Sequence, residues 1–150
     1  MKNLFDKESI TEIKDRINGL SASSQPEWGR MEVAQVLAHC NEVLKNSLGN
    51  PIPKRLLTGY LVAPFWKHKM YNDQPYKIRN NPTYKTFKIE DSRNFEIERK
   101  SLLSTIEDFH ENGHVKSKNA VHPLLGKFTP EQWAIGQYKH LDHHLRQFGL

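Results

Sequence analysis

Three of the eight histidines in this 150-residue chain, His140, His143 and His144, lie close together near its C-terminus. On an α-helix, residues four positions apart lie one turn apart and are offset by only about 40° around the axis. His140 and His144 can therefore direct their imidazoles toward a common point, and such a pair is a usual means of holding a transition-metal ion. The spacing predicts a metal-binding pair. A histidine-rich helix without a metal remains the alternative, because this spacing alone is a weak signal.

A further ligand must come from another element. The stretch from about Met31 to Leu48 has the apolar spacing of a helix, and His39 lies on the flank of its apolar face, roughly 110° from the centre. A flank position can point along the seam between two helices, so we expect His39 to be the third ligand. Three protein ligands leave one coordination position open for water or substrate. Cys40 falls on the apolar face and is expected to pack as a small apolar residue.

Other polar side chains are candidates for a supporting or pocket role. They are Gln35, Trp133, Gln137, His143 and His122. Trp133 and Gln137 continue the ridge that the histidine pair forms along one edge of the apolar stripe of the last helix. His143 falls outside this ridge, nearer solvent. His122 precedes a proline in a predicted loop, and we expect it to lie at the surface.

A second histidine pair has the same spacing, at His110 and His114. Asn112 and Gly113 lie between the two, and both residue types commonly end helices. We therefore expect a helix to stop there, so that the geometry of this pair is not held.

Four segments have the length and apolar periodicity of helices that pack in a bundle. They run from about Asp6 to Gly19, from about Met31 to Leu48, from after Asp91-Ser92 to Asn112-Gly113, and from Thr129 to the end. The last helix has the clearest start, since Thr129 suits the N-cap, Pro130 the first turn and Gln132 a capping box. With few strand signals, the pattern predicts a single all-α domain over residues 1–150, an up-and-down four-helix bundle.

The middle of the chain is less regular. A short apolar helix is expected from Lys54 to Val62, ended by Pro64. Residues 65–91 predict a long, partly ordered segment that packs its aromatic residues over one end of the bundle, with a short extended piece at 83–89.

The net charge of +5 is concentrated in this middle region. Residues 54–88 contain eight Lys or Arg and one Asp, which could attract an anionic ligand. A solvated basic connection is the alternative. The single cysteine excludes an internal disulfide, and the longest apolar run, Leu56–Trp66, is too short to span a bilayer. We expect a cytoplasmic protein without a membrane partner.

Residues 26–40, 122–133 and 138–148 together resemble an uncharacterised subgroup of the DinB/YfiT-like superfamily of proposed metalloenzymes. The last stretch contains a His-x-x-His-His-x-x-Gln motif that ends at Gln147. The resemblance covers both ends of the chain and leaves out its basic middle.

The resemblance implies a four-helix bundle with a divalent metal, commonly zinc or nickel, held by one histidine of the second helix and a pair of the last. Carried over to this chain, the ligands are His39, His140 and His144. Relatives include transferases and isomerases that use low-molecular-weight thiols, and a hydrolase-like member. Bundles of this superfamily often pair as homodimers.

These observations favour a metal-dependent enzyme that acts on a small molecule, anionic if the basic region takes part. It would activate either the thiolate of a small thiol or a water molecule, and a nearby Glu or His143 would act as the base in the second reaction. The alternative is a non-catalytic, stress-related protein that binds a metal or small ligand. Nucleic-acid binding is not favoured, because no recognised binding module accompanies the tyrosines of the basic region.

Overall fold

The computed structural model describes residues 1–50, 56–72, 74–76 and 84–150, and it is mostly helical. The α-helices of this part are α1 (Lys7–Asn18), α2 (Val33–Ser47), α3 (Thr58–Trp66), α4 (Phe95–Lys116) and α5 (Pro130–Arg146). Three 3₁₀ helices are η1 (Lys67–Met70), η2 (Lys85–Phe87) and η3 (Ser117–Asn119), and a two-stranded antiparallel hairpin pairs β1 (Val121–His122) with β2 (Gly126–Lys127). The structure is thus mostly helical, in agreement with the predicted all-α class, and the small hairpin was not predicted.

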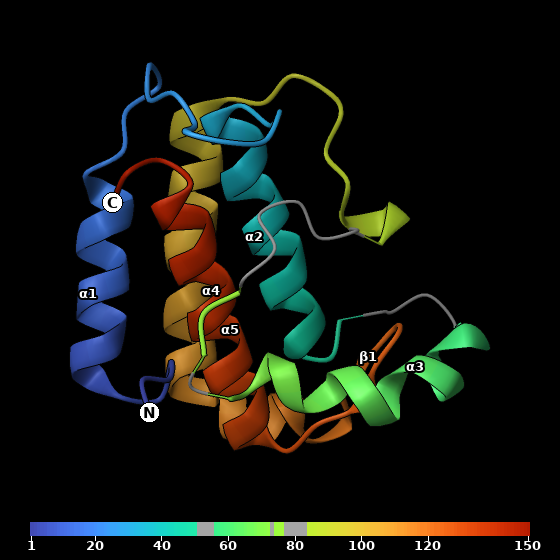
Figure 1. Cartoon of the computed structure of the whole chain (residues 1–150). Coiled ribbons are helices and arrows are strands. Elements are labelled where there is room, and N and C mark those ends of the chain that lie inside the picture. Colours follow the sequence, from blue (N-terminus) through green and yellow to red (C-terminus); the bar gives the residue numbers. More distant parts are fainter. Residues whose placement is uncertain (51–55, 73, 77–83) are drawn as a thin grey trace.

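The four longer helices pack lengthwise against one another, while α3 lies across them (Figure 1). Helix α5 contacts each of α1, α2 and α4, and α2 lies along α4. The core between them is mostly aliphatic, with some aromatic side chains, and includes Ile13, Ile17, Leu37, Leu44, Leu102, Ile106, Phe109, Leu141 and Leu145. No helix in the described part of the chain has both the length and the apolar character needed to cross a membrane.

The predicted starts of the first and last helices are confirmed. Asp6 caps α1 by accepting a hydrogen bond from the backbone N–H of Ser9 at 2.9 Å. Thr129 and Gln132 form the expected reciprocal capping box of α5, with Pro130 in its first turn. These contacts satisfy N–H groups that have no partner inside a helix, so they fix where α5 begins.

The third long helix begins after Asp91-Ser92, although neither of these residues is its N-cap, and its predicted end at Asn112-Gly113 is wrong. Its N-cap is Asn94, which accepts a hydrogen bond from the Ile97 N–H, and the helix continues through Gly113 to Lys116. Gly113 packs beneath two rings, because a β-carbon there would lie 2.9 Å from Phe5 and 3.2 Å from Phe109. The glycine permits this close contact and does not end the helix.

The short apolar helix does not end before Pro64, which lies inside α3. Because Pro64 is in the last turn, its missing N–H removes a single internal hydrogen bond. The expected start of this helix at residues 54–55 lies outside the described residues.

The segment after α3 departs from the prediction in two ways. The expected extended piece is in part the 3₁₀ helix η2, although residue 83 lies outside the described part. The aromatic residues also do not gather over one end. Tyr71 contacts Phe128 just before α5, Tyr76 contacts His143 near the end of α5, and Phe87 packs against the rest of the protein with 8% of its surface exposed. The segment therefore lies along the helices that carry the histidines.

Candidate metal centre

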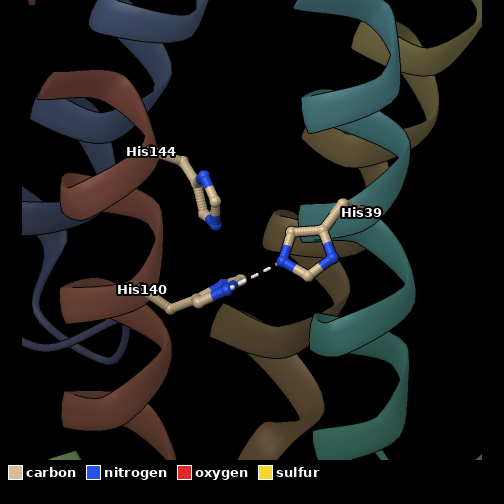
Figure 2. Close-up of side chains that lie close together, drawn as sticks. All are labelled: His39, His140 and His144. Atoms are coloured by element: carbon tan, nitrogen blue, oxygen red, sulfur yellow. Dashed lines mark hydrogen bonds between the residues drawn. The ribbon is translucent and has the colours of Figure 1, made fainter. Parts of the chain in front are cut away.

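Three histidine side chains from two helices converge in the seam between α2 and α5. His39 comes from α2, and His140 and His144 come from successive turns of α5 (Figure 2). Each offers one ring nitrogen, and the three nitrogens lie within 4.8 Å of one another. The structure thus brings together the three residues that the sequence proposed as ligands.

The tautomer of His39 is set by a backbone carbonyl. Its Nδ1 lies 2.7 Å from the carbonyl oxygen of Phe87, which can only accept a hydrogen bond. Nδ1 therefore carries the proton, and Nε2 presents a lone pair toward α5. Nε2 of His39 lies 3.2 Å from Nε2 of His140.

The tautomer of His144 is set by Gln147, one turn further along the chain. The Gln147 Nε2 donates to the carbonyl oxygen of Trp28 at 2.7 Å, which leaves Oε1 facing His144. That oxygen accepts from Nδ1 of His144 at 3.0 Å. The Nε2 atom of His144 is therefore unprotonated as well, and available as a ligand.

His140 differs from the other two histidines. Its Nδ1 is buried and has no hydrogen-bond partner, and the same holds for the Oε1 atom of Gln137, one turn earlier on α5. Gln137 is only 1% exposed, and its Nε2 makes one long contact of 3.5 Å to the carbonyl of Val43. Gln137 and His140 lie three residues apart on α5, so the two unpartnered atoms belong to neighbouring positions on one side of the helix.

Burial keeps all three imidazoles neutral near physiological pH. It lowers the pKa of His39, and it lowers the pKa of His144 to about 3. The pKa of His140 falls well below its usual value, first through burial and then through the charges that the neighbouring histidines would carry. Neutral imidazoles are the form that binds metal ions.

The donor set fits a divalent transition metal. At metal–nitrogen distances of about 2.0–2.1 Å, two ligands of a tetrahedral ion lie roughly 3.3 Å apart. His39 and His140 already have this spacing. Imidazole ligands suit zinc, copper, nickel and iron, whereas calcium and magnesium prefer oxygen.

The remaining candidates lie at varying distances from the cluster. Gln35 completes a capping box with Glu32 and donates to the carbonyl of Asp91, so it stabilises the start of α2. Trp133 is buried against Phe128 and the ring of His122. These contacts support the fold at the start of α5.

His122 is partly buried, whereas the sequence predicted a surface position. The hairpin folds its ring toward Trp133, and Nδ1 accepts hydrogen bonds from the N–H groups of Leu124 and Leu125 at 3.1 and 3.0 Å. Burial lowers the pKa of His122 to about 4. The loop composition was misleading because the turn supplies polar partners for a ring that otherwise packs among aromatic side chains.

His143 is also more covered than expected. It is partly buried, and its ring contacts those of Trp28, Tyr76 and His144. It therefore borders the cluster on the side covered by the segment after α3.

The predicted helix stop between His110 and His114 is wrong, since α4 continues through both residues. Both rings nevertheless face the N-terminal segment. Nδ1 of His110 lies 3.0 Å from the carbonyl of Leu4, and the ring of His114 stacks on Phe5.

Lys139 holds the covering segment against α5. Its ammonium group donates to the carbonyl of Lys69 and the side chain of Asn72, both at 2.6 Å, and lies 4.7 Å from the ring of Tyr76. The amine thereby fixes Tyr76 next to His143. The sequence did not predict that Tyr76, Trp28 or the Phe87 carbonyl would lie at the histidine cluster. Gln147 could be singled out beforehand, because it ends the His-x-x-His-His-x-x-Gln motif.

One family matches nearly the whole chain. Its description reads "Protein of unknown function (DUF1569)", and the match extends over residues 3–149. No curated protein and no solved structure matched the chain.

Proposed function

Since the chain belongs to the family described as "Protein of unknown function (DUF1569)", its activity must be argued from the site, and we propose a metal-dependent enzyme with an open three-histidine centre. The ligands are His39, His140 and His144. The single observation that carries the proposal is that three neutral imidazoles converge, two of them with their Nδ1 protons already engaged elsewhere. Metal-binding histidines characteristically have such outer hydrogen bonds.

The scaffold in this proposal is a four-helix bundle of the DinB/YfiT-like kind, formed by α1, α2, α4 and α5. The contacts of α5 with the other three helices support it. Zinc and nickel are the proposed metals, because both accept neutral imidazole ligands.

A bound divalent ion in such a site would lower the pKa of a coordinated water or thiol. For hydrolysis, His143 is the proposed base, since its ring centroid is 5.3 Å from that of His144. For thiol chemistry the thiolate must come from a small molecule, because Cys40 is 2% exposed and burial raises its pKa. A thiol that carries a carboxylate would suit the basic region of residues 54–88.

The alternative is a non-catalytic, stress-related protein that binds a metal or small ligand. A structural zinc site usually has four protein ligands. Among the described residues, the cluster contains three groups of the types that commonly bind metals. This number favours the open, catalytic form.

The proposal is tested by metal analysis of protein purified without added metal, for the parent and for His144→Ala. The parent should hold about one transition-metal ion per chain, and the variant should lose most of it. Equal metal content in both proteins would show that the site is misassigned.

A further inference from the structure

Helix α3 packs its small residues against the protein and turns its large apolar residues toward solvent. Gly59 and Ala63, one turn apart, are buried. Gly59 lies so close to the β1–β2 turn that a β-carbon there would clash with the carbonyl oxygen of Leu124. On the outer side, Leu57, Leu61 and Phe65 are 84%, 77% and 72% exposed. Their spacing of four places them in one stripe.

The exposed apolar surface is concentrated in this helix. Ten large hydrophobic side chains are exposed in the described part of the chain, and six of them lie between residues 56 and 66. Scattered exposed apolar residues need no explanation, whereas a contiguous group marks an interaction surface. In Figure 1, α3 lies across the longer helices and one of its ends extends beyond them.

Positive charge borders the stripe. The turn that follows α3 contains Lys67, His68 and Lys69, and the ammonium group of Lys69 lies 4.2 Å from the ring of Trp66. Residues 54–88 carry a net charge of +7 in the sequence. A partner that binds this stripe should therefore have an apolar interior and a negatively charged surface.

We propose that α3 docks in the plane of an anionic lipid surface. Its nine residues extend for about 13.5 Å, less than half of the roughly 30 Å of a hydrocarbon core, so it can lie in the interface but not span it. Leucine and phenylalanine side chains enter the acyl region, tryptophan and tyrosine favour the headgroup level, and lysines attract anionic headgroups. An isolated interfacial helix turns a polar face away from the lipid. In α3 that face instead packs against the rest of the protein.

A second copy of the chain fits this surface less well. A symmetric contact through α3 would bring two clusters of the same charge together, which is unfavourable. A stable dimer also buries about 800 Å² on each partner. A helix of two and a half turns offers less than that.

The test is co-sedimentation of the full chain with phosphatidylcholine vesicles, with and without phosphatidylglycerol. We expect binding to the anionic vesicles that weakens with added salt. Leu61→Asp and Phe65→Asp should each reduce binding by about tenfold or more, because each removes an apolar side chain that the proposal buries in the lipid. Ile97→Asp on α4, at a position that is 66% exposed, is the matched control and should leave binding unchanged.

Thermal unfolding of the four proteins should agree, because all the substitutions are at exposed positions. Equal vesicle binding by Leu61→Asp and Ile97→Asp would overturn the proposal. A second result would also overturn it: the parent protein does not bind anionic vesicles, and light scattering shows a dimer that Leu61→Asp dissociates. The apolar stripe of α3 would then be covered by a second copy of the chain. Both results are independent of the metal centre.

Discussion

The Nε2 atoms of His39 and His140 lie 3.2 Å apart although 101 positions separate the two residues in the chain. His39 carries its proton on Nδ1, so Nε2 of His140 must donate a proton to His39 in the metal-free protein, or two lone pairs would face each other. In the proposed metal centre, an ion would take the place of that proton and bind both nitrogens. The three rings already converge in the metal-free protein.

The first prediction concerns thermal stability. Zinc at about one hundred times its dissociation constant adds roughly 2.7 kcal/mol to the free energy of unfolding, which raises the melting temperature by about 5–10 °C. His140→Ala should abolish this rise. His68→Ala, at an exposed histidine of η1, should retain it. Calorimetry with and without zinc makes the comparison, and an equal rise in all three proteins would place the metal elsewhere.

Gln147 positions His144, and its removal should weaken metal binding. The amide joins Nδ1 of His144 to the carbonyl of Trp28. Loss of such an outer hydrogen bond typically reduces metal affinity by about 10–100-fold. We expect this loss in Gln147→Leu, measured by competition with a chromophoric chelator. Gln147→Glu keeps an acceptor for His144 and should lose less; equal losses would argue against a positioning role.

Gln137 should matter only when the metal is bound. In the metal-free protein, both its Oε1 and Nδ1 of His140 are acceptors, and neither has a partner. A metal ion held at Nε2 would place the proton of His140 on Nδ1, which then needs an acceptor, and Oε1 of Gln137, three residues earlier on α5, is unpartnered. Gln137→Leu should therefore lower zinc affinity by about tenfold or more.

The same variant should not reduce the stability of the metal-free chain, because it removes an unsatisfied buried acceptor. Equilibrium unfolding in the presence of a chelator provides this second measurement. Unchanged affinity together with lower stability would mean that Gln137 only packs.

Acid should destabilise the metal-free protein partly through His122. Its pKa is about 4 in the folded chain, below the ordinary value of 6.5, so the unfolded chain binds the proton more readily. The stability that the neutral ring provides is complete above pH 6.5 and is lost progressively as the pH falls toward 4. At pH 5 the loss is about 2 kcal/mol.

His122→Asn keeps an acceptor for the Leu124 and Leu125 N–H groups without a titrating ring. Between pH 7 and pH 5, its free energy of unfolding should fall by about 2 kcal/mol less than that of the parent. Both proteins retain the cluster histidines, whose contribution cancels in the comparison. Parallel pH profiles would contradict the assignment.

Sequence patterns found the parts of the site that lie on regular helices. The spacing of His140 and His144 and the flank position of His39 follow from 3.6 residues per turn, and the capping box at Thr129 sets the register of α5. The tautomer of His39 depends on the backbone carbonyl of Phe87, in a segment without periodicity. A carbonyl has no residue type to recognise, so only the folded chain identifies it.

The wrong predictions share a cause. Gly113 resembles a helix stop and His122 resembles a loop histidine, because local composition was weighed without tertiary contacts. The rings of Phe5 and Phe109 require a residue without a side chain at Gly113, and Trp133 offers His122 a packing surface. Tertiary packing therefore determines the helical conformation at Gly113 and the burial of His122.

The last prediction separates thiol transfer from hydrolysis. Metal-loaded protein is incubated with an aryl halide, with and without a small carboxylate-bearing thiol. In the thiol reaction, the sulfur–carbon bond forms as the carbon–halogen bond breaks, and the thiol proton is released with the halide. If this assignment is right, the halide is consumed only when the thiol is present. Cys40→Ala should behave as the parent does, because Cys40 is buried and burial raises its pKa. Equal consumption without the thiol would exclude thiol-dependent transfer and leave water activation beside His143 as the reaction to examine.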